Sequence, residues 1–184
     1  MIKELLKETR SVRRYDELRE ISYRELIEIA EAVRYCPSAA NLQRIRICPV
    51  LGEKRDEVFD TLAFAAYLRP WVRPKEGERP VAYLVLMAEA DVDINLAIDA
   101  GIAAEAIALA AREKGIGYCM FRSFNADNLT RVLGKEGYKP ILVISLGYPG
   151  ERVELETSAD DLRYYRDENG VHHLPKLPLE NLLI

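Results

Sequence analysis

The sequence is poor in the residues that cross-link chains or hold metals. Its 184 residues include 3 cysteines, at positions 36, 48 and 119, and 2 histidines. An odd number of cysteines without a Cys-x-x-Cys pair argues against a disulfide framework and indicates a reducing compartment. The histidines are adjacent, so in an extended segment His172 and His173 point to opposite sides and do not favour a shared metal site. We therefore expect no bound metal.

Signals for export, membrane insertion and nucleic-acid binding are also missing. The first ten residues are amphipathic and charged, unlike a secretory signal, and Asp99 and Glu105 interrupt the longest apolar run. The formal net charge of −4 disfavours a nucleic-acid partner. We expect a cytoplasmic protein with no membrane or nucleic-acid partner. The many Glu, Lys and Arg residues beside few Met, Cys and His are typical of thermophilic proteins.

No hydrolytic or dinucleotide-binding motif is present. There is no Gly-x-Ser-x-Gly, and no Ser, Cys and His combination indicates a triad. The Gly-Ile-Gly stretch at 115–117 lacks the third glycine of the dinucleotide fingerprint, since position 120 is Met120, and it follows a helix. It is either a helix C-cap or a turn whose bare backbone approaches a ligand. An enzyme with this sequence would depend on a cofactor for its chemistry.

The hydrophobic pattern predicts one α+β domain spanning residues 1–184. Ser22 and Glu25 form a capping box at the start of one helix, which Pro37 ends. Residues 68–80 read as an irregular loop, and the charged tail ends in apolar residues expected to pack on the surface or on a partner. The predicted helices cover 2–9, 22–36, 53–66, 94–114 and 125–133, and the predicted strands cover 45–51, 81–87 and 141–147.

Two polar clusters stand out from this framework. RSVRRY at 10–15 holds three arginines, which form either a solvated surface patch or, with Ser11, a phosphate site. PSAANLQ at 37–43 lies between a helix and a strand and has more polar residues than a plain turn requires. It is either turn chemistry or a set of groups directed at a ligand.

Five segments in order resemble the FMN-dependent nitroreductase family. They are RSVRRY at 10–15, PSAANLQ at 37–43, DAGIAAEAIALAAREKGIGYCM at 99–120, ILVISLGYP at 141–149 and PKLPLENLL at 175–183. The resemblance implies an α+β three-layer sandwich whose central sheet is mixed or mostly antiparallel and is flanked by helices. It also implies an intertwined homodimer with non-covalent FMN at the subunit interface, reduced by NAD(P)H.

The resemblance carries over cofactor contacts by position. Arg10 and Ser11 correspond to phosphate and ribityl contacts, and Arg13 to a cation near flavin N1 and O2, where reduction places negative charge. The backbone wall for the flavin ring corresponds to Pro37, Ser38 and Ala39, and the polar contacts beside it to Asn41 and Gln43. The turn near flavin N5 or O4 corresponds to Ile116 and Gly117, and a late phosphate contact to Lys176.

Departures from the family pattern leave the function partly open. Thr9 stands where many members carry arginine, Arg44 and Ile45 replace Pro-Trp, and the loop with Trp71 either lines the substrate side or packs. The resemblance implies ping-pong hydride transfer through flavin N5, from NAD(P)H to a small acceptor such as a nitroaromatic or quinone, with no catalytic side chain. The alternatives are another flavin reaction on the same fold, or an FMN-binding carrier or regulator with low turnover.

Overall fold

The central element of the fold is a five-stranded sheet. The computed structural model describes residues 2–64, 67–89 and 91–184. Strands β2 (Arg46–Val50), β3 (Ala82–Ala88) and β5 (Lys139–Pro149) are neighbours in that order, and β5 also pairs with β4 (Gly117–Phe121) and β1 (Tyr15–Asp16). All of these pairings are antiparallel. Ser11 and Tyr118 add an isolated parallel bridge beside β4.

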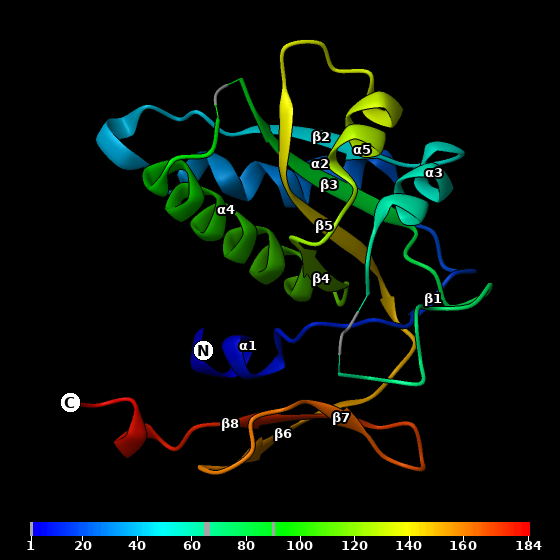
Figure 1. The fold of residues 1–184 in the computed structure, drawn as a ribbon, viewed down its shortest axis with the longest axis vertical. Helices are drawn as coiled ribbons and strands as arrows, with labels where there is room; N and C mark the ends of the chain where they lie inside the picture. Colours follow the sequence, from blue (N-terminus) through cyan, green and yellow to red (C-terminus); the bar gives the residue numbers. More distant parts are fainter. Residues whose placement is uncertain (1, 65–66, 90) are drawn as a thin grey trace.

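Helices cover both faces of this sheet. Successive side chains of β3 point to opposite faces, so Leu84 and Leu86 join one core and Tyr83, Val85 and Met87 join the other. The first core contains α2 (Tyr23–Glu31) and α4 (Ile94–Glu113), and the second contains α3 (Lys54–Thr61) and α5 (Ala126–Leu133). The three-layer α+β sandwich is thereby confirmed (Figure 1).

Local sequence signals set the bounds of α2. The Ser22 side chain accepts from the Glu25 backbone and the Glu25 carboxylate accepts from the Ser22 backbone, which confirms the capping box. The α-helix ends at Glu31 and continues as a 3₁₀ turn, η1 (Ala32–Tyr35). The residue before Pro37 is extended, with ψ of 141°, because proline excludes the helical conformation there.

The predicted helix at 53–66 is too long. In the structure α3 ends at Thr61, after which Leu62 forms an antiparallel bridge with Phe124. The backbone amide of Ala63 donates to the carbonyl of Ser123, and that of Asn125 to the carbonyl of Thr61. Because these backbone groups bond to the segment before α5, the helical hydrogen-bond pattern of α3 does not continue beyond Thr61. Residues 65–66, at the predicted end, lie outside the described residues.

Helix α4 is the central helix and has one buried face. Its length and composition would suffice to cross a membrane, but Leu96, Ala100 and Ala104 are buried against the sheet, as in a core helix. On the opposite side, Ile94 and Ile98 are 73% and 54% exposed in the single chain. The helix therefore carries an uncovered apolar face.

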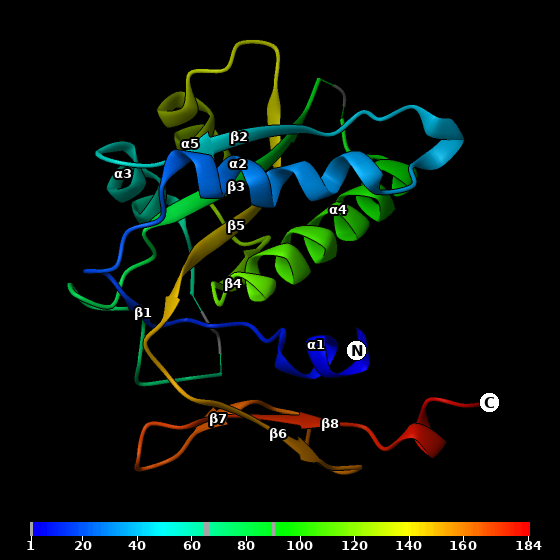
Figure 2. The same ribbon diagram turned by 180° about the vertical axis from the view of Figure 1, so that it is seen from behind.

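The C-terminal tail forms a second sheet, which was not predicted from the sequence. β6 (Val153–Thr157) pairs in parallel with β8 (His172–Lys176), which pairs antiparallel with β7 (Tyr165–Arg166). This small sheet lies beyond the short N-terminal helix α1 (Ile2–Glu8), on the side away from the main sheet (Figure 2). The chain then ends in the 3₁₀ turn η3 (Leu179–Asn181), where the predicted anchors are exposed: Leu179, Leu182, Leu183 and Ile184.

Candidate functional site

The PSAANLQ turn has a strained backbone. It contains the short 3₁₀ turn η2 (Ala39–Asn41), and Ala40, Asn41 and Gln43 have φ angles of 50°, 55° and 47°. A non-glycine residue in this left-handed region costs about 1–2 kcal/mol. Such strain persists where surrounding contacts enforce it, and it concentrates at functional sites.

Hydrogen bonds hold this turn in shape. The Ser38 hydroxyl accepts from the backbone amide of Gln43 at 3.1 Å, and the Gln43 side chain donates to the Asn41 side chain at 3.2 Å. The backbone amide of Ala39 donates to Oδ1 of Asp99, on α4, at 3.0 Å. The polar side chains of the motif thus stabilise the backbone conformation of the turn. At Ala39 and Ala40 the backbone carries only a methyl group.

A cavity of about 470 Å³ opens beside the turn. Asp99 lines it; this residue is 4% exposed, and its Oδ2 atom is buried without a hydrogen-bond partner among the described residues. Pro37, Ser38 and Gln43 line the same cavity. The turn and an incompletely paired buried carboxylate therefore meet at one hollow.

Arg44, one of the departures from the family pattern, binds the start of α4. Its guanidinium donates two hydrogen bonds to the Asp93 carboxylate, at 2.6 and 2.9 Å. Asp93 also caps α4 by accepting from the backbone amide of Leu96 at 2.7 Å. The Arg44 guanidinium holds the pKa of Asp93 well below its usual range. This ion pair therefore links the residue that directly follows the turn to the start of α4.

The arginine segment runs beside β4, at the other end of α4. Thr9 is fully buried, and its hydroxyl donates to the carbonyl of Leu5, so position 9 offers no group to a ligand here. One Arg10 Nη atom donates to the carbonyl of Leu6 at 2.5 Å, while its Nε is buried without a partner among the described residues. Ser11 sits in the bridge to Tyr118.

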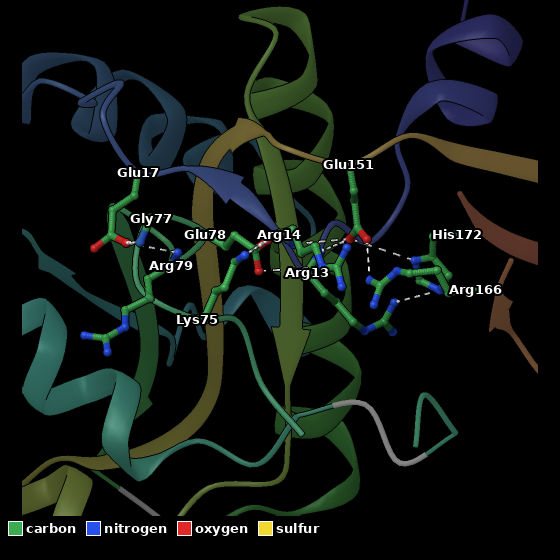
Figure 3. Close-up of polar contacts among 10 residues, drawn as sticks. All are labelled: Arg13, Arg14, Glu17, Lys75, Gly77, Glu78, Arg79, Glu151, Arg166 and His172. Carbon is green, nitrogen blue, oxygen red and sulfur yellow. Dashed lines mark hydrogen bonds and ion pairs between the residues drawn. The ribbon is translucent and has the colours of Figure 1, made fainter. Parts of the chain in front are cut away.

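Arg13 belongs to a buried polar cluster (Figure 3). Glu151, whose side chain is 1% exposed, accepts from the backbone amides of Arg13 at 2.5 Å and Arg14 at 3.2 Å, and from the Arg166 guanidinium. The Arg13 guanidinium lies 3.4 Å from Nε2 of His172 and 4.6 Å from the centre of the Tyr164 ring. The tail therefore contacts the arginine segment in two ways: Glu151 accepts from its backbone amides, and His172 and Tyr164 contact the Arg13 side chain.

The Gly-Ile-Gly stretch ends α4, in agreement with the helix C-cap, which is one of the two interpretations of its sequence. Gly115 has φ of +72°, and the backbone amide of Ile116 donates to the carbonyl of Ala111. Ile116 is fully buried in the core. A side chain at Gly117 would come within 2.9 Å of the Val12 side chain. Close packing of Val12 therefore explains this glycine without a ligand.

Two other predicted positions lie in the tail and the 68–80 loop. Lys176 ends β8, exposed, and its carbonyl accepts from the backbone amide of Ser158 at 2.9 Å. Trp71 is half-buried; its ring meets Phe64 edge-on, and the Arg166 guanidinium lies 5.1 Å from its centre. These contacts favour the packing interpretation of Trp71.

The two predicted halves of the site are separate within one chain. Asp99 holds the turn near the start of α4, whereas Arg112, near its end, donates to Glu8 just before the arginine segment. Asp99 and Arg112 are about 20 Å apart, since an α-helix rises about 1.5 Å per residue. Figure 1 shows the turn and α1 at different ends of α4. One chain does not bring RSVRRY and PSAANLQ together.

Sequence reasoning missed Glu151, His172 and Asp99 as site residues. Glu151 contacts Arg13 across 138 positions, and nothing nearby distinguishes it from other charged tail residues. The opposite orientation of the two histidines is confirmed: His172 is buried beside Arg13, and His173 contacts Glu156. A carboxylate on the most apolar helix was the one available signal for Asp99.

The fold is similar to that of several solved structures. A nitroreductase family protein from Streptococcus pneumoniae has a TM-score of 0.73 at 18% identity, with 100% of this chain and 99% of that chain covered. The FMN-dependent nitroreductase NfnB from Mycobacterium smegmatis, in complex with NADPH, has a TM-score of 0.65 at 21% identity, covering 81% and 87%. A putative NADH dehydrogenase/NAD(P)H nitroreductase from Parabacteroides distasonis has a TM-score of 0.66 at 18% identity, covering 82% and 88%.

No curated protein matches the sequence. The nitroreductase family model, in contrast, matches residues 6–148, which is well over half of the chain. That range includes the arginine segment, the strained turn, α4 and nearly all of β5. The chain therefore belongs to the nitroreductase family.

Proposed function

We propose that this protein is an FMN-dependent oxidoreductase that takes a hydride from NADH or NADPH and passes electrons to a small acceptor such as a nitroaromatic or a quinone. The proposed active form is a homodimer with two FMN sites, each shared between the subunits. Family membership alone does not specify the cofactor, the hydride donor or the dimer, and the proposal adds these three. An FMN-dependent, NADPH-bound relative of the same fold supports it.

The separation of the half-sites along α4 is the observation that carries the proposal. If two copies of α4 pack antiparallel about a twofold axis, the turn of one subunit lies near the arginine segment of the other. The single interface of the dimer then holds two equivalent sites. A monomer would leave the two halves of each site near opposite ends of α4.

Uncovered apolar residues support this dimer. Four residues of α4 on one side of the helix are exposed in the single chain, among them Gly101, beside which a second helix can approach closely. The tail also ends in exposed leucines and an isoleucine. Exposed patches of this kind are typical of interfaces. The α4 face consists of Ile94, Ala97, Ile98 and Gly101.

The residues around the arginine segment suit a phosphate. A cavity of about 340 Å³ there is lined by three cations, Lys7, Arg10 and Arg112, and by Glu8 and Glu151. Glu8 is paired with Arg112 and Glu151 with Arg166, whereas Arg10 has a buried Nε without a partner among the described residues. An unpaired guanidinium donor matches a phosphate oxygen. The donor set therefore fits the FMN phosphate.

Each half-site has a defined part in this proposal. FMN, when bound, supplies hydride transfer through N5. Arg10, Ser11 and Lys176 would hold its phosphate and ribityl chain, and Arg13 would place positive charge near N1 and O2. The partner's turn would provide a flat wall at Pro37, Ser38 and Ala39 and polar contacts at Asn41 and Gln43; the backbone at Ile116 and Gly117 would be nearest N5. Since the protein need not move a proton, its contribution is orientation and charge.

Spectroscopy of the purified protein tests the proposal. We expect a yellow dimer whose flavin bleaches with NADH or NADPH under anaerobic conditions and recovers its colour with a quinone or nitro compound. A bound flavin that stays oxidised with both donors would support a low-turnover carrier instead. A colourless protein that cannot be reconstituted with FMN would refute FMN binding altogether.

Mixed dimers test the shared site. Arg10→Ala removes a contact from one half-site and Asn41→Ala from the other. When the two variants are unfolded together and refolded, about half of the dimers contain one of each, and each such dimer has one intact site. We expect roughly a quarter of the wild-type FMN sites to return, at wild-type affinity. Recovery no greater than the average of the separate variants would place both residues in one subunit's site.

A further inference from the structure

The neutral state of His172 is fixed by its surroundings. The ring is fully buried, and burial, with the positive charges of Arg13 and Arg166, lowers the pKa of His172 to about 3. Other ionisable groups near the ring are Glu151, 3.9 Å from Nδ1, and neighbouring His173. The ring is therefore uncharged at neutral pH, and its contact with Glu151 is not an ion pair.

The tautomer of His172 follows from its contact with Arg13. A guanidinium stays protonated and can only donate, and Nη1 of Arg13 lies 3.4 Å from Nε2 of His172. Nε2 must then present a lone pair, so the ring proton is on Nδ1. Nδ1 has no hydrogen-bond partner among the described residues and faces the Glu151 carboxylate, which is too distant for a hydrogen bond.

Among the described residues, the Arg13 guanidinium is hydrogen-bonded along one edge. Its guanidinium has five donors, of which one meets His172 in the described part of the chain, and its face lies against Tyr164. The Arg13 backbone is fixed separately by Glu151, which also binds Arg166. Figure 3 shows Glu151, Arg166 and His172 gathered on one side of Arg13. The remaining donors are thus available to a ligand.

We propose that His172 is a positioning residue for Arg13: as the Nδ1–H tautomer it accepts from the guanidinium and holds it against Tyr164, with the other donors directed to the pyrimidine edge of FMN. This inference rests on the proposed function. Glu151 completes the arrangement by fixing the Arg13 backbone and the tail. His172 thereby sets how strongly Arg13 stabilises the negative charge that reduction places at N1 and O2.

The flavin midpoint potential tests this role. His172→Phe keeps an aromatic ring but removes the acceptor. We expect the affinity for reduced FMN relative to oxidised FMN to fall about three- to tenfold, the size expected for one lost hydrogen bond, with a more negative potential. His172→Gln, which keeps an acceptor, should restore most of the potential. His173→Phe is the matched control and should leave it unchanged.

A double-mutant cycle separates positioning from general disturbance. In an Arg13→Ala protein, His172→Phe should shift the potential no further, because His172 acts through Arg13. Additive shifts, or a His172→Phe potential equal to wild type in a protein that binds FMN, would overturn the inference while leaving the proposed function intact.

Nitrogen NMR of the two imidazoles, recorded without FMN, tests the contact even if the variants fold poorly. We expect His172 as the Nδ1–H tautomer with no titration from about pH 5 to pH 8, while His173 titrates. An Nε2–H tautomer, or titration of His172 near pH 6.5, would overturn the inference. Absence of FMN binding with the expected tautomer would instead refute the proposed cofactor and leave the contact between His172 and Arg13 standing.

Discussion

The backbone amide of Ala39 donates to Oδ1 of Asp99 over 3.0 Å, and this bond joins the strained turn to α4. Asp99 is buried and lines the cavity, and its second oxygen, Oδ2, is buried without a hydrogen-bond partner among the described residues. The carboxylate thus helps to enforce a backbone that the local sequence would not choose, since Ala40 adopts a positive φ without being glycine.

Asp99→Ala should relax this turn. Loss of the acceptor leaves the Ala39 amide unpaired, and we expect the free energy of unfolding to fall by about 1–3 kcal/mol. FMN affinity should fall too, because the turn forms one wall of the proposed site. Chemical denaturation and FMN titration measure the two effects. Asp99→Asn, which keeps Oδ1 as an acceptor, should be milder, and Asp160→Ala, at an exposed aspartate, should be neutral.

Ile98→Arg should separate the subunits. This residue is 54% exposed on the α4 face, where a charge would be buried on dimerisation. We expect a folded monomer by sedimentation and loss of FMN retention, because each proposed site needs both chains. Leu18→Arg, at an even more exposed apolar residue in a turn, is the matched control and should remain dimeric. A dimeric, FMN-loaded Ile98→Arg protein would contradict the proposed interface.

Gly147→Ala should destabilise the sheet. A side chain at Gly147 would come within 2.7 Å of the Tyr15 ring, whose hydroxyl is bonded to the Val12 carbonyl and to Ser145, each at 2.7 Å. Because Tyr15 is buried and fastened at its far end, it has no room to yield. We expect a loss of about 1–3 kcal/mol in the free energy of unfolding, measured by urea denaturation. A wild-type midpoint would show that the ring can move.

The tail sheet should loosen as the pH rises. Burial lowers the pKa of His173, but its contacts with Asp167 and Glu156 outweigh burial, and the pKa is raised above its ordinary value of about 6.5. The resulting stabilisation is complete below pH 6.5 and is lost as the pH rises through the raised pKa. Hydrogen exchange at β8, corrected for its intrinsic pH dependence, should therefore be less protected at alkaline pH. In His173→Gln this dependence should disappear.

The sequence signals that worked were local or periodic. The capping box at Ser22 and Glu25 predicted a helix start, and the apolar run of β3 predicted a strand buried on both faces. Those features depend on neighbouring residues alone. The ordered motifs then indicated the family, and the family model confirms it.

What escaped prediction depends on contacts between distant segments. β6 and β8 pair although their registered residues, such as Val153 and His172, lie far apart in the sequence, and no local pattern predicts that pairing. Two local signals were available: Val153 and Leu155 alternate with Glu154 and Glu156, as in a strand with one apolar face. In addition, Asp167 accepts from the amides of Asn169 and Val171, and Gly170 has φ of +79°, which is turn chemistry between two short strands. The role of Glu151 had no such local mark.

The arginine segment is bonded along its main chain before any ligand arrives. Val12 donates to Tyr118, Arg13 and Arg14 donate to Glu151, and Tyr15 donates to Glu78. Ordering a flexible loop around a cofactor would cost about 1–2 kcal/mol per residue in backbone entropy. Here that ordering has already occurred during folding, so less of the binding free energy is lost to it. If FMN binds as proposed, the tail and the 68–80 loop contribute to its affinity by making the segment rigid in advance.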